Sequence, residues 1–199
     1  MSSFLIKDAT IIDPITKKQK KADICLKNGK IVSKEELKAE KVISASGLIA
    51  VPGLIDLHAH LREPGREDEE TIYSGSLAAA LGGYTTVVCM PNTNPPLDSL
   101  ATLKYVQKQA QQAAIEIKFV GAVTKEQKGE ELAPLGELAA GGVVGFSDDG
   151  FPVANANLMR RALEYSRIFN LPIISHAEDK ELAKGGVMNE GRQATLLGL

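Results

Sequence analysis

Short apolar runs rich in β-branched residues occupy much of the first fifty positions of the chain. They lie at residues 4–6, 10–12, 22–27, 30–33 and 41–44. Asn28-Gly29 separates the third run from the fourth, and this pair readily adopts the positive φ angles of a two-residue hairpin turn. We expect the basic run at residues 17–21 to be a solvated loop between strands. Because so small a sheet is marginally stable alone, it should need strands from elsewhere in the protein.

From residue 51 onward the pattern changes to short apolar runs that alternate with helical stretches. The runs lie at residues 54–57, 85–90, 115–123, 143–146 and 172–175. Apolar residues at spacings of three and four after Asp98-Ser99 predict a helix over residues 100–113, and a second helix is expected over 157–169. Continuously apolar strands separated by helices are typical of a parallel sheet covered on both faces, so residues 51–199 predict about five β/α units.

Two β/α architectures compete for this pattern. A Gly-rich phosphate loop directly after a strand would favour an open doubly wound sheet, but Gly82-Gly83 and Gly141-Gly142 both precede strands. A (β/α)8 barrel has eight strands and about 250 residues, so this chain would supply only its first part. Polar residues follow several of the apolar runs, and barrel enzymes place their reacting groups at the carboxyl ends of their strands. The sequence therefore favours the barrel.

Composition excludes several classes of partner. The 23 Lys and Arg residues nearly balance the 25 Asp and Glu residues, so no basic surface is expected for nucleic acid or an anionic membrane. No apolar run reaches the about 18 residues of a membrane span, and Lys7 comes too early for a signal peptide. Cys25 and Cys89 lie inside apolar runs, so we expect no disulfide and a cytoplasmic location.

The three histidines of the chain all follow the last apolar residue of a predicted strand. His58 and His60 are separated by one residue, so on an extended backbone both imidazoles point the same way and can bind one metal ion. His176 follows the fifth run. Each position also has a structural interpretation, namely an incidental His-x-His pair and, for His176, a buried, hydrogen-bonded imidazole.

Carboxylate, guanidinium and amide groups fall at the same predicted edge. Asp148 and Asp149 follow the fourth run, although Asp-Asp-Gly is also good turn chemistry. Together with the histidines they predict an open site for Zn²⁺ or another divalent ion. Arg62 and Asn92 predict a pocket for a substrate carboxylate, with a surface ion pair and a turn as the alternatives. A metal beside such a pocket predicts hydrolysis of a small anionic substrate.

Four motifs carry a resemblance to a known family. They are PGLIDLHAHLREPG at 52–65, MPNTNP at 90–95, GFSDDG at 145–150 and SHAED at 175–179. In this order they resemble the motifs of the amidohydrolase superfamily, and within it those of bacterial dihydroorotases of the long type. Allantoinases and hydantoinases share the first motif but usually carry a carboxylated lysine as the metal bridge. The absence of lysine between Lys128 and Lys180 favours dihydroorotase.

The resemblance covers the whole chain and implies both a fold and an activity. Residues 51–199 would be the first part of the metal-binding (β/α)8 barrel, and residues 1–50 part of a small β-sandwich. The implied activity is zinc-dependent hydrolysis of a cyclic amide, the interconversion of N-carbamoyl-L-aspartate and dihydroorotate in de novo pyrimidine biosynthesis. Such enzymes hold two zinc ions in each full-length subunit.

The resemblance also implies roles for individual residues. His58 and His60 would bind one zinc ion, His176 would help to bind a second, and Asp149 would bridge them, with Asp148 as the runner-up for the bridge. The residues implied to bind the substrate are His60, Arg62 and Asn92.

The family's catalytic Asp and its remaining metal-binding His have no counterpart before Leu199. We therefore expect this chain to be a fragment that is inactive without the C-terminal remainder of the barrel. Two alternatives stay open, an allantoinase or hydantoinase type of hydrolase and a non-catalytic dihydroorotase-like partner of aspartate carbamoyltransferase. A homodimer and a complex with that carbamoyltransferase are the candidate assemblies.

Overall fold

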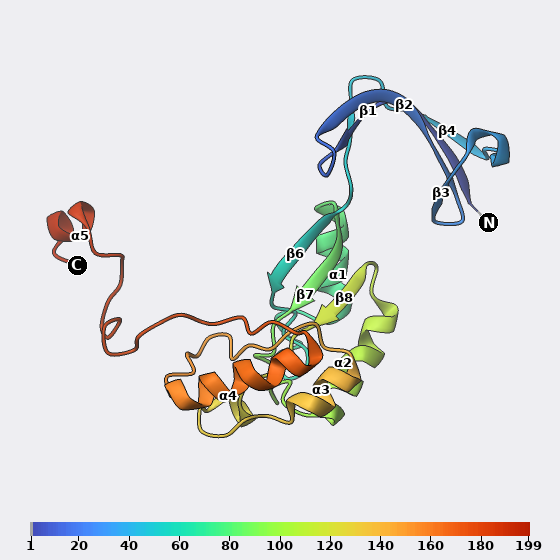
Figure 1. The fold of residues 1–199 in the computed structure, drawn as a ribbon. Coiled ribbons are helices and arrows are strands. Elements are labelled where there is room, and N and C mark those ends of the chain that lie inside the picture. The colour runs from blue at the N-terminus through green and yellow to red at the C-terminus, as the bar shows by residue number, and fades with distance from the viewer. Residues whose placement is uncertain (1) are drawn as a thin grey trace. The chain divides into compact units, whose positions relative to one another are not determined.

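The computed structural model describes residues 2–199, which divide between Gly53 and Leu54 into two compact units (Figure 1). The division falls beside residue 51, where the hydrophobic pattern changes. No helix of the described residues is both long and apolar enough to cross a membrane.

The first unit is one five-stranded sheet. Its strands are β1 (Ser3–Asp13), β2 (Lys18–Lys27), β3 (Lys30–Val32), β4 (Lys41–Ser44) and β5 (Ile49–Ala50). Strand β1 pairs antiparallel with β2 and parallel with β4 and β5. Asn28 and Gly29 have φ angles of 52° and 75° and join β2 to β3, with Lys27 paired to Lys30. The predicted hairpin is therefore confirmed.

The basic run of the first unit was expected to be a loop, and most of it is strand. Strand β2 begins at Lys18, and its residues Lys20 and Lys21 pair with Ile11 and Thr10 of β1. The lysine side chains are exposed, so their backbone can form the ladder while their charges stay in water. Charge alone therefore did not indicate the local backbone conformation.

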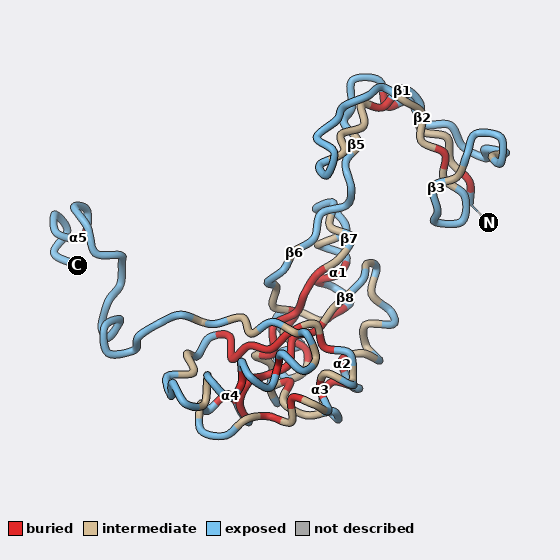
Figure 2. Tube along the Cα trace, viewed as in Figure 1, coloured by how far each residue is buried: buried red, intermediate tan, exposed pale blue. Residues whose placement is uncertain are grey.

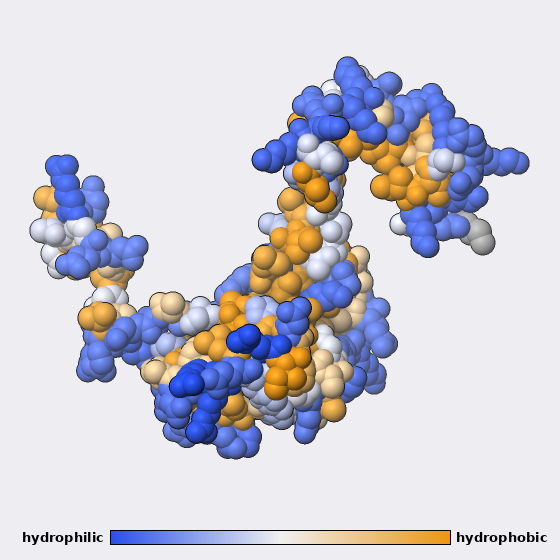
Figure 3. Space-filling view, viewed as in Figure 1, coloured by the Kyte–Doolittle hydropathy of each residue, from blue (hydrophilic) through white to orange (hydrophobic). Residues whose placement is uncertain are grey.

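The sheet of the first unit leaves an apolar face open. Figure 3 shows apolar side chains gathered on one face of this sheet, and a hollow of about 560 Å³ is lined there by residues such as Ile24, Ile31 and Val51. Ile31 is 78% exposed, and few residues of the unit are buried.

The second unit is built on parallel strands in sequence order. They are β6 (Leu54–Ala59), β7 (Tyr84–Cys89) and β8 (Glu116–Phe119). Single parallel bridges continue this order from Gly121 to Phe146 and from Phe146 to Ile173. The expected runs at 143–146 and 172–175 thus lie parallel to β8 in the predicted order, but they form isolated bridges rather than regular strands. The run at 115–123 ends as a strand at Phe119.

Helices and short helical turns connect these segments. The helices are α1 (Ile72–Leu81), α2 (Leu100–Gln109), α3 (Leu135–Gly141), α4 (Ala156–Ser166) and α5 (Arg192–Leu197). The short turns are η1 (Lys34–Glu36), η2 (Ala110–Gln112), η3 (Lys125–Gln127) and η4 (Arg167–Phe169). Both expected helices are confirmed, as α2 with η2 and as α4 with η4. Ser99 begins α2 because its hydroxyl accepts a hydrogen bond from the Thr102 amide.

The core of the second unit lies between the parallel segments and helices α2 and α3 (Figure 2). Phe146 is fully buried there, with Leu103, Leu135 and Leu138 in the same cluster. Cys25 and Cys89 are both free and buried, as predicted. This packing places the residues that follow Phe146 at the carboxyl end of the parallel segments.

Candidate metal centre

His58 lies near the carboxyl end of β6 and His60 follows directly after the strand, and their imidazoles face the same space. The two ring centroids lie 5.1 Å apart in an edge-to-face arrangement. The amide of His58 donates to the Asp56 carboxylate at 2.9 Å. The His-x-His pair therefore has the geometry that the extended backbone predicts.

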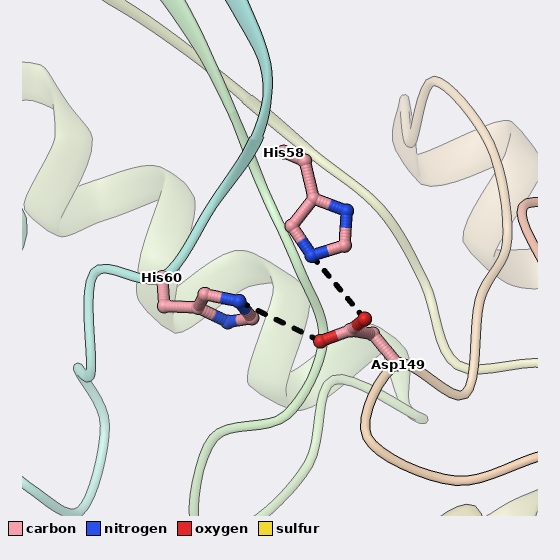
Figure 4. Close-up of side chains that lie close together, drawn as sticks. All are labelled: His58, His60 and Asp149. Carbon is pink, nitrogen blue, oxygen red and sulfur yellow. Dashed lines mark ion pairs between the residues drawn. The ribbon is translucent and has the colours of Figure 1, made fainter. Parts of the chain in front are cut away.

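The carboxylate of Asp149 lies between His58 and His60, as Figure 4 shows, and His176 lies near the same carboxylate. Its Oδ1 is 3.2 Å from His58 Nε2 and 3.8 Å from His176 Nδ1, and its Oδ2 is 3.6 Å from His60 Nε2. All four predicted ligands thus converge, although they follow three different parallel segments. The Asp149 carboxylate is buried, while the imidazoles are more exposed.

Asp148 turns its carboxylate away from the histidines and into the protein. Its Oδ1 accepts from the amides of Val123 and Thr124 at 2.8 and 3.0 Å, and its Oδ2 accepts from the Thr124 hydroxyl. Burial raises the pKa of this carboxyl above its usual value, while the hydrogen bonds from Thr124 and Val123 lower it. Both carboxylate oxygens of Asp148 accept hydrogen bonds from the protein, so Asp148 stabilises the turn, whereas Asp149 faces the centre.

Asn92, which follows β7, contacts two members of this cluster. Its Oδ1 lies 2.9 Å from His60 Nδ1, and its Nδ2 donates to Asp149 Oδ2 at 3.3 Å. Arg62 has a positive φ angle of 56°, so the chain no longer follows the strand direction there. Its Nε lies 3.8 Å from Glu69 Oε2, an ion pair of the kind given above as the alternative role for Arg62.

Two acidic residues, one in the loop after β6 and one beside His176, were given no role by reasoning from the sequence. Glu63 is buried, and its Oε2 accepts from the amide of Ile72 at 2.8 Å, at the N-terminus of α1. Glu178 places Oε2 3.4 Å from His176 Nε2. The buried role of Glu63 had no sequence signal, because it stands in a charged stretch. Glu178 had one, since it lies two residues after a candidate ligand.

The loop after β6 packs closely against the loop after β7. Gly65 has a φ angle of 99°, and a Cβ atom placed on it would lie 2.1 Å from the carbonyl oxygen of Asn94. The amide of Asn94 donates to the carbonyl of Pro64 at 2.9 Å. A glycine is therefore required at position 65, and this contact fixes the loop that carries Arg62.

The donors at the centre fit a borderline divalent cation. His58, His60 and Asp149 each offer a ligand atom, and these atoms lie within 4.8 Å of one another. Imidazole nitrogens with a carboxylate oxygen, and no thiolate, form the donor set of open catalytic zinc sites. The residues present therefore fit a metal ion.

Comparison with solved structures defines the class of fold. The chain is similar to L-hydantoinase (dihydropyrimidinase) from Arthrobacter aurescens, with a TM-score of 0.76 and 22% identity over 94% of this chain and 45% of that one. It is also similar to a D-hydantoinase, with a TM-score of 0.65 and 25% identity over 89% of this chain and 40% of the other. The fold is thus that of the amidohydrolase enzymes.

Comparison of sequences then defines the family. The sequence model of the dihydro-orotase-like family matches residues 47–199. The dihydroorotase of Endomicrobium trichonymphae is 52% identical over 98% of this chain and 46% of its own length, and that of Pelotomaculum thermopropionicum is 48% identical over the same shares. This chain belongs to the dihydroorotase-like family. It spans about half the length of the curated relatives it matches.

Proposed function

We propose that this chain is the N-terminal part of a dihydroorotase, a zinc-dependent enzyme that interconverts N-carbamoyl-L-aspartate and dihydroorotate in de novo pyrimidine biosynthesis. The observation that carries this proposal is the convergence of three histidines on the Asp149 carboxylate. The names of the relatives support the choice of substrate, because those at 46–52% identity, such as the dihydroorotases of Endomicrobium trichonymphae and Acetivibrio thermocellus, share nearly the whole chain.

In this proposal His58, His60, Asp149 and His176 hold two zinc ions, with Asp149 between them. A bound zinc ion supplies a Lewis acid that polarises the ring carbonyl and acidifies a water molecule. The ionised Asp149 carboxylate and the imidazole nitrogens of His58 and His60 can each offer a lone pair to a cation, and these ligand atoms lie within 4.8 Å of one another.

The substrate carboxylate is assigned to Arg62, with Asn92 and His60 beside it. The Arg62 guanidinium can donate two parallel hydrogen bonds to a carboxylate. Its pairing with the exposed Glu69 is long at 3.8 Å and weak in water, so a substrate carboxylate can replace it. The expected general acid and base, an Asp, lies outside residues 1–199.

We also propose that residues 1–199 are inactive alone. The chain spans 46% of the length of its relatives in Endomicrobium trichonymphae and Pelotomaculum thermopropionicum, and the catalytic Asp is assigned to the other part. Turnover should appear when the C-terminal part is present and not before. Activity of residues 1–199 by themselves would contradict this assignment.

The test is a ring-opening assay on the purified full-length protein with dihydroorotate, allantoin and hydantoin as parallel substrates. We expect dihydroorotate to be opened with the highest kcat/KM and zinc to be present in the purified protein. Faster opening of allantoin or hydantoin would assign the chain to the alternative type of hydrolase. A protein that neither binds metal nor turns over any ring would instead be a non-catalytic partner, for which aspartate carbamoyltransferase is the candidate to test by co-purification.

A further inference from the structure

The amide of Asn92 bridges a candidate metal ligand and the carboxylate at the centre. Its oxygen lies 2.9 Å from His60 Nδ1, and its nitrogen donates to Asp149 Oδ2 at 3.3 Å. Asn92 therefore uses both ends of its side chain within the centre itself.

The order of donors and acceptors fixes the protonation pattern of His60. An ionised carboxylate can only accept, so Asp149 requires the NH2 end of the Asn92 amide to point toward it. The carbonyl end then faces His60, and a carbonyl also only accepts. The neutral His60 ring must therefore carry its proton on Nδ1, which leaves the lone pair on Nε2.

That lone pair is directed at the place where a metal would bind. His60 Nε2 lies 3.6 Å from Asp149 Oδ2, in the same space as His58 Nε2. An imidazole that binds a metal commonly donates its other N–H to a fixed acceptor, and this contact sets both tautomer and ring orientation. Asn92 supplies such an acceptor for His60.

The backbone around Asn92 is well fixed. The amide of Met90 donates to the carbonyl of Ala59 at 2.9 Å, which ties the end of β7 to the end of β6. The buried Pro91 accepts from the amides of Thr93 and Leu97, both at 2.9 Å. Asn92 thus stands opposite His60 without depending on its own side-chain contacts.

We propose that Asn92 is a positioning residue of the metal centre, which sets the tautomer and orientation of His60 and steadies Asp149. This role is additional to the substrate contact assigned to it above, and it rests on the proposed metal site. Loss of such an outer partner typically lowers metal affinity by about 10–100-fold. A residue that only binds substrate would change KM and leave metal affinity unchanged.

The experiment measures zinc affinity in the full-length protein by competition with a chromophoric chelator, without substrate. Asn92→Ala removes both contacts, and Asn92→Leu removes them while keeping the branched shape of the side chain. Asn94→Ala is the matched control, because Asn94 is an exposed residue of the same loop whose side chain makes no hydrogen bond among the described residues. We expect about 10–100-fold weaker zinc binding in both Asn92 variants and an unchanged value in the control.

The outcomes separate this proposal from the proposed function. Zinc affinity within twofold of the wild type in both folded Asn92 variants, together with a raised KM, would restrict Asn92 to the substrate and overturn the positioning role. Because the zinc measurement needs no turnover, a wild type that binds zinc but does not open dihydroorotate would contradict the proposed activity alone. Thermal unfolding of each variant, compared with the wild type, shows that the variants are folded.

Discussion

The two sides of the candidate metal centre receive different support from the rest of the Leu54–Leu199 unit. Asp149 follows the fully buried Phe146, and its side chain is only 10% exposed. The side chain of His58 is 48% exposed, and Leu57 beside it is 71% exposed. Among the described residues strand β6 pairs only with β7, and residues 177–193, which follow His176, are all exposed. The carboxylate is therefore held by the core, and the imidazoles come from its margins.

This difference shows what positions a site that is assembled from separate strand ends. Asp149 is placed by the packing of Phe146 in the core and by its neighbour Asp148. The carboxylate of Asp148 accepts hydrogen bonds from Val123 and Thr124, in the segment that follows β8. His58 and His176 depend on fewer neighbours, so contacts within the centre contribute more to their placement. The buried carboxylate is the fixed point toward which the marginal histidines turn.

The largest contrast in stability should be between Phe146 and Leu57. Phe146→Ala leaves a cavity in the core and should lower the free energy of unfolding by about 3–5 kcal/mol. Leu57→Ala removes an exposed side chain of β6 and should change it by about 0.5 kcal/mol or less. Urea unfolding of both variants in the full-length protein is the measurement.

An effect of Leu57→Ala as large as that of Phe146→Ala would contradict this comparison. It would mean that the exposed face of β6 is covered in the full-length protein. The strand that carries His58 would then belong to the core as well. The same pair of variants therefore tests whether β6 contributes less than the core to the stability of the unit that holds the metal centre.

Asp149→Asn should reduce zinc affinity more than any single change at the margin. The substitution keeps the shape of the side chain but removes the charge that faces three imidazoles, so the loss should exceed the about 100-fold upper value for an outer partner. His176→Ala should cost less, because His176 lies furthest from the carboxylate. Chelator competition measures both, and Glu137→Gln, which removes an exposed charge on α3, is the control. Equal losses for Asp149→Asn and His176→Ala would remove the distinction between centre and margin.

The convergence of the candidate ligands could be predicted from the sequence, because a hydrophobic pattern shows where strands end. His58, His60, His176 and Asp149 all follow apolar runs, and parallel order brings such ends to one edge. The hairpin at Asn28-Gly29 was equally predictable, since those residues suit positive φ angles. The lengths of the strands could not be predicted, because isolated bridges at Phe146 take the place of regular strand pairing.

The resemblance implied Asp149 rather than Asp148 as the bridge, but the structural role of Asp148 had no signal in the sequence. Both are the same residue type in one turn, and only the third dimension shows that Val123 and Thr124 occupy the oxygens of Asp148. The contact of Asn92 with His60 is likewise a long-range pairing without a local signal. Arg62 was expected at the same edge as the histidines, and the pattern did not indicate the positive φ angle at which the chain leaves the strand direction.

The buried thiol of Cys89 allows the burial of the central strand β7 to be tested by the pH dependence of stability. Burial raises the pKa of its thiol to about 11 from the ordinary value of 9.0, because the thiolate would lose its hydration. Below pH 9 the folded and unfolded states both keep the proton, so this thiol adds no pH dependence. Between pH 9 and 11 only the unfolded state releases it, so the free energy of unfolding should fall by up to about 3 kcal/mol.

The measurement is urea unfolding of the full-length protein at several pH values from 8 to 11, with Cys89→Ala as the control. The Cys89 contribution is the part of the pH dependence that the control loses. An identical dependence in wild type and control would show that β7 is open to water. Cys89 should also resist alkylation at pH 8 in the folded protein, since the thiolate is the reactive form.

Thr124→Val tests the contact that separates Asp148 from Asp149. The Thr124 hydroxyl donates to Asp148 Oδ2 and accepts from the amide of Gly129 at 2.9 Å. Valine keeps the shape of the buried side chain but leaves both partners with one hydrogen bond fewer, which costs about 1–3 kcal/mol of unfolding free energy. Thr124→Ser keeps the hydroxyl and loses one methyl group, so it should retain the zinc affinity of the wild type. If the Asp148 contact places Asp149, Thr124→Val should weaken zinc binding as well as stability, whereas a loss of stability with unchanged zinc affinity would show that Asp149 is held by the core packing alone.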